Sequence, residues 1–515
     1  MNKKSRNLFI ANAALLSFVN IIMRGIAVSF NAYVNRKVGA ECMGLFTLVM
    51  SIYGFAVTLA LSCVNLAAVR LTSERSAALE EACADRASWK YGMRSVVRSV
   101  CLYSFLFGAG AGLLLFLTSD LSARYFLHDM RTVTSLRVLA VSLPAISLSS
   151  ALSGYFTGLR KVSKNAVTAV SEQMIKIAVT STALALIMPG NVESACLAVV
   201  GGSAIAEAWS LLLNFIMYIT DSLKPAGYGY GESGKCGSEA MRQIKLTTSL
   251  RDAAAIALPS AIGTYARQGL TTLEHLAIPA GLKKSGLSSE KALSAYGLLQ
   301  GIAFPLVMFP YAVIGSFTSL LVPEMAERCE LGDHAGIAKL TEQVYRYSAI
   351  FSVGACGIFT CFANELGILV YDSSDASLYT LLLGLLVPFM YLDTAVDALL
   401  KGIGEQVYVM KVNIADAASG LLLVWLLTPI LGIYGFILTI AVCEIGNLAA
   451  SIHRLGRVTG VGIRRAVRYY LVPIMICASL AVVKRYMMTD IEPICAVVIF
   501  ASAYVLGNCI FWKRS

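Results

Sequence analysis

The residues with the clearest potential for chemistry are ionisable side chains inside long apolar segments. Arg24 lies in the middle of the first such segment, about residues 8–34, and about 20 apolar helical residues are enough to cross a bilayer. A charge at that depth costs roughly 2.5–3.5 kcal/mol on insertion scales, so Arg24 must face a wet cavity or a partner within a helix bundle. Because arginine stays protonated and its guanidinium binds phosphate bidentately, one prediction is an anion site. The alternative is an ion pair with an internal carboxylate such as Glu274 or Asp397.

Other ionisable residues lie in comparable apolar surroundings. Charged residues within membrane spans mark substrate or ion pathways, so we predict that a group of them lines a transport cavity. Two arginines from the two halves of the chain would suit a phosphate or pyrophosphate group, and isolated acids have the alternative of being packed, hydrogen-bonded struts. The predicted cavity residues are Arg24, Arg267, Lys176, Glu172, Asp393 and Asp397, and the further intramembrane acids are Glu207, Asp416 and Glu444.

Two pairs have the i, i+4 spacing that places side chains on one helix face. Glu172 and Lys176 can pair in this way, either as part of a cavity or as a structural salt bridge. Asp393 and Asp397 are followed four residues later by Lys401. That charged face either lines a cavity or lies near the cytoplasmic end of its helix, where water solvates it.

The composition explains why these charges stand out. The chain has 515 residues, of which 57% are hydrophobic and 14% charged, and its mean hydropathy is +0.70. These values indicate an all-α polytopic membrane protein and exclude a disordered chain. The net charge of +11 is explained by basic cytoplasmic loops, so we expect no nucleic-acid partner. The 13 cysteines are scattered singly and indicate core residues, with no metal site.

Apolar run lengths predict about 14 spanning helices. Lys and Arg concentrate in the loops on one side of this topology, which places both termini in the cytoplasm. The predicted limits are 8–34, 43–69, 96–118, 133–157, 165–188, 193–219, 250–275, 296–323, 346–370, 376–400, 407–428, 431–453, 466–484 and 493–512.

Rare residues recur at a nearly constant offset, which predicts an internal repeat. The matched pairs are Arg24 with Arg267, Pro144 with Pro388, Gly158 with Gly402, Glu172 with Asp416, and Glu207 with Glu444. Six helices in each half would give both halves one orientation, with the binding site between them near the midplane. The predicted organisation is an N-terminal lobe at 1–220, a hydrophilic cytoplasmic linker at 221–249, a C-terminal lobe at 250–455, and two further helices at 456–515.

Signatures of enzymes are missing from the sequence. It contains no phosphate-binding Walker motif, no Gly-x-Ser-x-Gly and no metal-type histidine cluster. His275 beside Glu274 is interpreted as structural, with a proton relay as the alternative. We therefore predict a transporter without catalytic residues, cofactor or resident metal, driven by an unidentified coupling ion (Na+ or H+), the membrane potential or substrate supply.

Several stretches resemble one family, the polysaccharide exporters of the multidrug/oligosaccharidyl-lipid/polysaccharide superfamily. The resemblance is closest to the stage V sporulation protein B branch, which is related to the lipid II flippases. It covers most of the chain and is carried by residues 24–25, 38–46, 152–159, 166–173, 278–282, 295–301 with Pro305, and 321–324.

The resemblance implies a V-shaped bundle of two six-helix lobes that alternates between inward-open and outward-open states. It implies a cationic cavity for a pyrophosphate, with Arg24 matching the functional first-helix arginine of the lipid II flippases, and a lipid-tail groove formed by the last two helices. The sequence departs from those flippases in helix 2, which has no arginine before Arg70, and at Gln300, where they carry an arginine. These departures favour the sporulation branch or a general polysaccharide exporter.

The main functional prediction is a monomeric flippase that moves an undecaprenyl-linked sugar precursor, for peptidoglycan, spore cortex or another polysaccharide, to the outer leaflet. A cation-coupled multidrug antiporter of the same superfamily is the alternative, although carboxylates and aromatic residues would then dominate the cavity. A polymerase or ligase acting on lipid-linked sugars is a third hypothesis. It would need a large outer loop, and the predicted outer loops are short.

Overall fold

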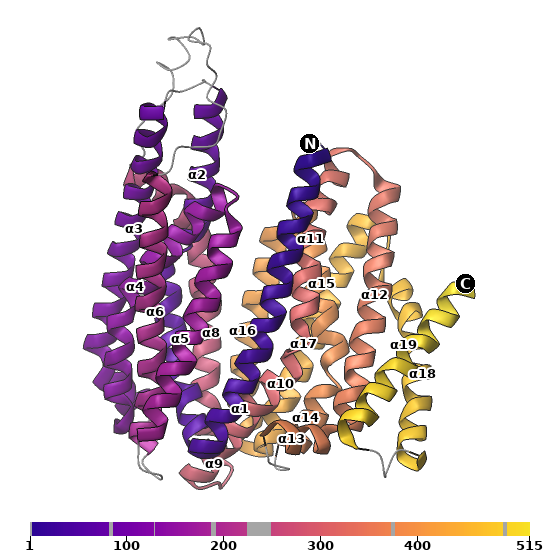
Figure 1. Ribbon diagram of the computed structural model, residues 1–515. Coiled ribbons are helices and arrows are strands. Elements are labelled where there is room, and N and C mark those ends of the chain that lie inside the picture. Colours follow the sequence, from indigo (N-terminus) through magenta and orange to yellow (C-terminus); the bar gives the residue numbers. More distant parts are fainter. Residues whose placement is uncertain are drawn as a thin grey trace. The chain divides into compact units, whose positions relative to one another are not determined.

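The computed structural model describes residues 3–81, 86–127, 129–186, 192–223, 249–371, 376–487 and 492–514. Within these ranges every regular element is a helix and no strand occurs (Figure 1). The prediction of an all-α polytopic membrane protein is confirmed. Most of the predicted linker at 221–249 lies outside the described residues.

Nine helical segments of the described ranges are long and apolar enough to cross a membrane, or up to 11 if each of two bent helix pairs forms one span. One of the nine, Ile21–Leu79, has 59 residues and would extend about 90 Å at 1.5 Å per residue, roughly three times the hydrocarbon thickness. It therefore contains more than one crossing, in line with the separate predicted helices at 8–34 and 43–69. The total of about 14 spans stays a prediction.

The chain forms two compact units, and each unit combines two separate stretches of the sequence. Unit 1 comprises Met1–Val19 and Leu48–Thr272, and unit 2 comprises Asn20–Thr47 and Leu273–Ser515. The long helix α1 therefore contributes its middle to unit 2, and most of α8 belongs to unit 1. These units divide the chain differently from the predicted lobes at 1–220 and 250–455, which stay a prediction.

Unit 1 is built around α4, which packs against α2, α3 and α6, while α5 packs mainly on α6. Helix α1 is bent at Gly39, where φ is 80°, and ends at Ser62 and Cys63, which both have positive φ. The elements are α1 (Lys3–Leu61), α2 (Val64–Glu81), α3 (Arg86–Leu121), η1 (Ser122–Leu127), η2 (Met130–Thr132), α4 (Val133–Gly158), α5 (Val162–Leu186), α6 (Val192–Leu223) and α8 (Leu250–Lys284).

Unit 2 contains the remaining elements, and α15 packs there against α11, α12 and α17. The last two helices, α18 and α19, both contact α12 and are drawn in yellow in Figure 1. The elements are α9 (Ser289–Tyr296), η3 (Gly297–Ala303), α10 (Phe304–Met308), α11 (Tyr311–Glu330), α12 (His334–Cys361), α13 (Ala363–Tyr371), α14 (Ser377–Gly384), α15 (Val387–Ile403), α16 (Gln406–Leu431), α17 (Ile433–Thr459), α18 (Ile463–Met487) and α19 (Pro493–Arg514).

Two matched glycines give the repeat a structural basis. A Cβ on Gly158 of α4 would lie 2.9 Å from the Val69 carbonyl oxygen and 2.7 Å from Thr72 Cβ of α2. A Cβ on Gly402 of α15 would lie 2.9 Å from the Val322 carbonyl oxygen and 2.7 Å from Met325 Cβ of α11. In both units a helix pair approaches so closely that only a glycine fits.

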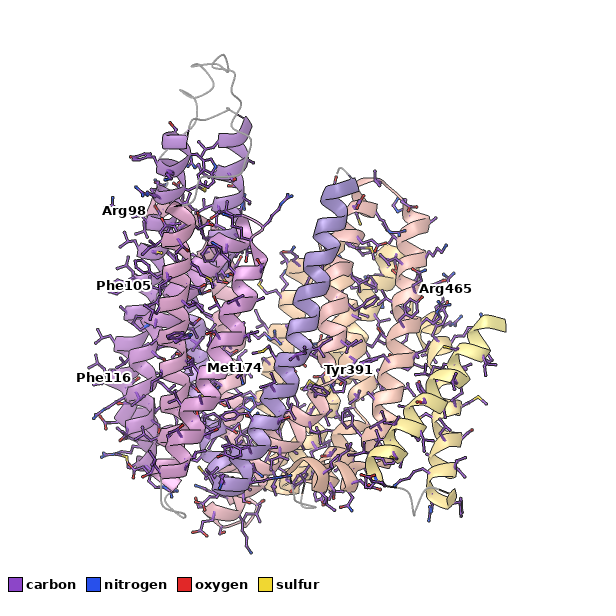
Figure 2. The ribbon with its side chains drawn as sticks, viewed as in Figure 1. Arg98, Phe105, Phe116, Met174, Tyr391 and Arg465 are labelled. Atoms are coloured by element: carbon purple, nitrogen blue, oxygen red, sulfur yellow. The ribbon has the colours of Figure 1, made fainter. Side chains whose placement is uncertain are left out.

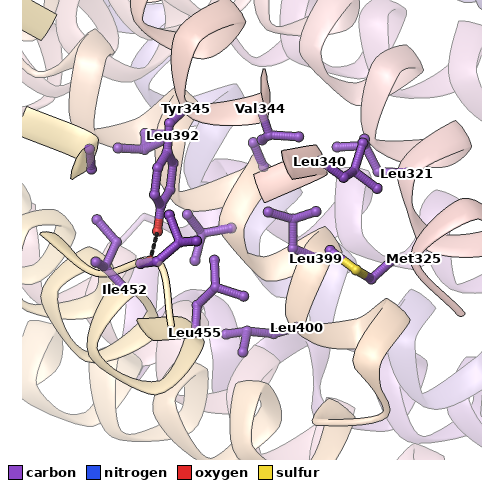
Figure 3. Close-up of a cluster of buried hydrophobic side chains, with 14 of the residues drawn as sticks. Leu321, Met325, Leu340, Val344, Tyr345, Leu392, Leu399, Leu400, Ile452 and Leu455 are labelled. Carbon is purple, nitrogen blue, oxygen red and sulfur yellow. Dashed lines mark hydrogen bonds between the residues drawn. The ribbon is translucent and has the colours of Figure 1, made fainter. Parts of the chain in front are cut away.

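The core of unit 2 lies where α11, α12, α15 and α17 meet. Leu399 and Leu400 are fully buried there with Val344 and Tyr345 (Figure 3). The Tyr345 hydroxyl donates a hydrogen bond of 3.3 Å to the Val461 carbonyl, so this buried aromatic side chain leaves no unpaired hydroxyl.

Large apolar side chains also cover the outside of the helices. On α3, Phe105 is 50% exposed and Phe116 is 44% exposed, and Figure 2 shows both on the outer side of the helix. An exposed apolar face of this extent is unfavourable in water, whereas lipid tails solvate it. The fold therefore needs the bilayer as its solvent.

Candidate functional site

Arg24 is an exposed residue of α1 in unit 2, and it lies at a break between two helices. Its Nη1 donates a hydrogen bond of 3.0 Å to the Met308 carbonyl, and its guanidinium carbon lies 5.3 Å from the centre of the Tyr311 ring. Arg24 also interacts electrostatically with Tyr391, and among the described residues neither Glu274 nor Asp397 forms an ion pair with it. Since a guanidinium has five N–H donors, most remain available.

The break explains why a carbonyl needs this arginine. Helix α10 ends at Met308 and α11 begins at Tyr311, with Pro310 between them. Proline has no N–H and disrupts the hydrogen bonds of the preceding turn. The Tyr391 hydroxyl donates 2.7 Å to the Val307 carbonyl, and Arg24 bonds the next carbonyl along the chain. Both side chains thus satisfy main-chain groups at the break.

Aromatic side chains continue from Arg24 towards an apolar pocket in the same unit. The Tyr311 ring lies 5.8 Å from the Tyr391 ring, which lies 6.0 Å from the Phe351 ring. Phe351 lines a pocket of about 530 Å³ between α11, α12 and α19. The α19 side chains in its wall include Phe500 and Tyr504, so one of the two C-terminal helices contributes to an apolar groove.

Arg267 lies on α8 in unit 1 and is exposed. Arg24 belongs to unit 2, so their joint binding of one anion stays a prediction. Gln300, which replaces an arginine expected from the resemblance, lies in the π-helical turn η3 of unit 2.

Three of the predicted charges of unit 1, Glu172, Lys176 and Glu207, lie on α5 and α6. Lys176 interacts electrostatically with both Glu207 and Glu172. The Tyr53 hydroxyl lies 2.7 Å from each Glu207 carboxylate oxygen and 2.8 Å from the Ser142 hydroxyl. Glu207 is therefore held by a buried network as well as by charge.

Glu172 and Glu207 also line a polar pocket of about 270 Å³ in unit 1. Its wall is formed mainly by α4, α5 and α6, and most of its side chains carry a hydroxyl, amide or carboxylate. The lining residues are Leu61, Ile146, Ser149, Ser150, Ser153, Asn165, Thr168, Ala169, Glu172, Glu207, Ser210 and Asn214.

Acidic residues gather in unit 2 on α15, α16 and α17. Asp397 is 7% exposed and accepts hydrogen bonds of 3.3 Å from Asn413 Nδ2 and the Ser451 hydroxyl. Lys401 Nζ lies 3.7 Å from Asp397 Oδ2. This helix face was predicted either to line a cavity or to lie near the solvated cytoplasmic end of the helix. The burial of Asp397 favours a position inside the bundle, and the half-exposed Lys401 lies at the edge of the buried region.

Asp393 interacts electrostatically with Asp397, Glu444 and Asp416, and its buried Oδ1 has no hydrogen-bond partner. Glu274 of α8 also interacts with Asp416. Within the described ranges, however, no three His, Cys, Asp or Glu side chains converge as a metal ion would require. The cluster is an acidic region of the bundle whose acids lie at separate positions.

Sequence reasoning missed the neutral half of the unit 1 pocket. Ser149 and Ser153 have the i, i+4 spacing of one helix face, and Glu207, Ser210 and Asn214 follow the same periodicity on α6. That polar stripe was a usable signal. The His275 ring nitrogen Nδ1 lies 3.2 Å from the Tyr296 hydroxyl, and its structural role stays a prediction.

A helical membrane bundle with repeated helix packing, an exposed intramembrane arginine and an apolar pocket has the features of a transporter. The model of the polysaccharide biosynthesis protein family matches residues 9–329, more than half of the chain, and the chain belongs to this family.

Relatives and solved structures agree with this membership. Stage V sporulation protein B of Bacillus subtilis (strain 168) is 23% identical over 438 residues, covering 85% of this chain and 81% of the relative. The sporulation protein YkvU of the same organism is 21% identical over 269 residues, covering 51% of this chain and 56% of the relative.

A lipid II flippase, MurJ in an inward closed conformation, has a TM-score of 0.67 at 14% identity and covers 97% of this chain and 99% of its own. An inward-facing multidrug resistance transporter of the MATE family and MOP superfamily has a TM-score of 0.64 at 13% identity, covering 87% and 100%. The predicted resemblance is confirmed at the level of the family by the family model, and the solved structures show that the fold is shared with a lipid II flippase and with a MATE transporter.

Proposed function

We propose that this protein is a flippase that moves an undecaprenyl-linked sugar precursor from the inner to the outer leaflet of a bacterial plasma membrane. Family membership supports a lipid-linked polysaccharide precursor as the substrate class, and the relatedness to stage V sporulation protein B supports a role of that precursor in sporulation. The transport unit is a monomer with cytoplasmic termini that works by alternating access.

The observation that carries this proposal is the continuity between a cation and an apolar pocket within unit 2. Arg24 stacks over Tyr311, and the rings of Tyr391 and Phe351 lead from there to the pocket beside α19. A guanidinium suits a pyrophosphate, and an apolar groove suits a polyprenyl chain. The two chemistries of a lipid-linked sugar thus meet at adjoining places.

The acids of unit 2 supply a route for energy coupling. Carboxylates buried in a bundle are costly unless a proton or cation compensates them. Asp393, Asp397, Asp416 and Glu444 therefore suit binding of H+ or Na+ that is linked to the transport cycle. The described acids do not converge on one three-carboxylate point, so compensation would be distributed over the cluster.

The same acids favour a second candidate, a cation-coupled multidrug antiporter. That function would use them to bind cationic drugs and would leave Arg24 as a structural cap of the helix break. Efflux of a fluorescent cationic dye from proteoliposomes would support this candidate, provided that the efflux is lost on substitution of Asp393 and retained on substitution of Arg24.

Translocation of a fluorescent undecaprenyl-pyrophosphate sugar in proteoliposomes tests the main proposal. We expect Arg24→Ala to reduce the rate about tenfold or more, because a charge-assisted hydrogen bond contributes roughly 1.5–3 kcal/mol. Arg24→Lys should retain part of the activity, since it keeps the charge and loses the bidentate fork. Arg98→Ala, which removes an exposed arginine of α3, is the matched control. Full activity of Arg24→Ala would refute the assigned role.

A further inference from the structure

The function proposed above leaves the polar pocket of unit 1 unused. It is enclosed mainly by α4, α5 and α6, and its volume is about 270 Å³. At roughly 30 Å³ per water molecule in the liquid, this is the space of about nine waters. Such a space exceeds a single bare ion and lies just below the range of roughly 300–1,000 Å³ typical of small-molecule sites.

The charge of the lining excludes an anion as the ligand. No arginine or lysine is among the described residues that line the pocket, whereas Glu172 and Glu207 both do. Lys176 interacts with these two carboxylates without being part of the lining. A phosphate would meet two acids and no cation at the surface, so the pocket suits a neutral ligand.

The hydrogen-bonding groups of the pocket are held in place by one another. Asn214 Nδ2 donates to the Ser149 hydroxyl at 2.9 Å, and Asn214 Oδ1 accepts from the Thr168 hydroxyl at 3.1 Å. The Ser149 and Ser210 hydroxyls lie 2.9 Å apart. Asn214 is 1% exposed and Ser210 is 4% exposed, so packing restricts their rotamers and the polar wall is preorganised.

Unused acceptor capacity remains in this wall. Asn165 Nδ2 donates to the Ser153 carbonyl at 3.0 Å and to the Thr157 hydroxyl at 2.8 Å, so the donors of this amide are already used. A carboxylate accepts hydrogen bonds at about four positions, which leaves Glu172 able to bind more than the Ser210 hydroxyl that it contacts. The ligand must therefore bring several donors of its own.

We infer that this pocket binds one sugar ring of the transported saccharide. A sugar is neutral and carries hydroxyls that both donate and accept, which matches a wall of hydroxyls, amides and carboxylates. Leu61 and Ile146 supply the apolar contact that the C–H face of a ring needs. The identification of the ring with the substrate's own sugar rests on the proposed flippase function, while the sugar specificity of the pocket rests on its chemistry.

A cation is the competing occupant, and three observations disfavour it. Glu207 already accepts hydrogen bonds from Tyr53, and Lys176 supplies a positive charge to both lining carboxylates. Within the part of the chain that the structure describes, no group of three potential metal ligands of the His, Cys, Asp or Glu type occurs. Neutral hydroxyl and amide groups make up most of the wall.

Binding of free glycosides to the full-length protein in nanodiscs tests the inference without lipid transport. The probes are the methyl glycosides of glucose and of N-acetylglucosamine, observed by saturation-transfer NMR, and the wild type should bind at least one of them. Ser150→Phe fills the pocket and Glu172→Gln replaces an acceptor by a donor. Each should weaken binding about tenfold or more, because a site that hydrogen-bonds substrate hydroxyls discriminates strongly once its partners are lost.

Matched controls place the same changes outside the pocket. Ser479→Phe adds the same ring to an exposed position of α18, and Glu74→Gln neutralises an exposed acid paired with Arg70. Both should bind glycoside as the wild type does. A wild type that binds neither glycoside, or variants Ser150→Phe and Glu172→Gln that bind normally, would overturn the inference.

Two further outcomes separate the sugar site from its alternatives. If NaCl stabilises the wild type against heat, and Glu172→Gln removes that effect while glycosides have none, the pocket is a cation site and the inference is wrong. If glycoside binding depends on the pocket but the proteoliposomes move no lipid-linked sugar, the flippase proposal fails and the sugar site stands. If translocation depends on Arg24 while glycosides bind independently of the pocket, only the sugar site fails.

Discussion

The polar pocket of unit 1 and the acidic cluster of unit 2 occupy equivalent positions of the internal repeat, yet their chemistry differs. Ser149 and Ser153 of α4 correspond by the repeat offset to Asp393 and Asp397 of α15. In unit 1 the Ser149 hydroxyl is paired with its neighbours, whereas in unit 2 the buried Asp393 Oδ1 has no partner. At these two matched positions unit 1 thus has neutral serines, whereas unit 2 has acids.

A lysine accounts for much of the remaining difference. The repeat partner of Lys176 is Gly420, and a Cβ there would lie 3.1 Å from both carboxylate oxygens of Glu274. Where unit 1 holds a positive charge, unit 2 therefore accommodates another acid. A duplicated fold can therefore direct its two halves to different ligands by changing few side chains. Here the proposed ligands are a neutral polyol in unit 1 and cations or protons in unit 2.

The largest effect should come from removing the charge that compensates unit 1. Lys176→Met leaves Glu172 and Glu207 without it, and breaking a buried pair costs about 3 kcal/mol or more. The midpoint of thermal unfolding in detergent should fall, and the double variant with Glu172→Gln should recover part of the loss. Lys401→Met in unit 2 should cost under about 1 kcal/mol, since its side chain is 47% exposed. Equal losses would contradict the comparison.

The paired glycines should give the next largest effect, and one of similar size in both units. Gly158→Leu and Gly402→Leu each force a side chain against a neighbouring carbonyl oxygen, and such overpacking costs about 1–3 kcal/mol. Unfolding midpoints of the two variants measure this. Gly110→Leu and Gly446→Leu are the controls, because a Cβ there meets nothing within 4 Å. A large loss in one unit alone would break the structural equivalence.

The third-largest effect should come from removing a hydrogen bond to Glu207 or to Asp397. Tyr53→Phe removes the hydroxyl that serves Glu207 and should lower the free energy of unfolding by about 1.5 kcal/mol, the lower end for bonds to charged groups. Ser451→Ala in unit 2 should cost about 1 kcal/mol or less, because Asp397 keeps Asn413 and Lys401. Thermal unfolding of both variants measures these losses of stability. A greater loss for Ser451→Ala than for Tyr53→Phe would contradict the prediction.

The smallest effect should have the opposite sign. Asp393→Ser gives unit 2 the unit 1 residue and removes a buried carboxylate oxygen without a partner, so stability should stay the same or rise by up to about 1 kcal/mol. Asp397→Ser should instead destabilise, because it breaks two hydrogen bonds. If Asp393→Ser proves strongly destabilising in the same unfolding measurement, Asp393 has a compensating partner within the fold.

Apolar run length was sufficient to predict the fold class, the resemblance of several stretches indicated the family, and the spacing of rare residues predicts the repeat. The sequence patterns could not predict which unit each helix joins. Residues 20–47 belong to unit 2 and residues 250–272 to unit 1, and this choice depends on side-chain packing and not on how apolar a segment is. The hydrogen bond from Arg24 to the Met308 carbonyl could not be predicted either, because the break at Pro310 frees a main-chain group that composition does not reveal. The charged half of the unit 1 pocket was predicted, but its serines are common helix residues whose role appears only when three helices meet.

The position of Arg24 at a helix break has a mechanical consequence. The guanidinium stabilises the carbonyl of Met308, and any anion that draws the guanidinium away leaves that carbonyl to find another donor. Binding free energies are reciprocal, so an anion that loosens the junction between α10 and α11 binds more tightly when the junction is already loose. Arg24 would then control the stiffness of a helix junction that lies 284 residues further along the chain.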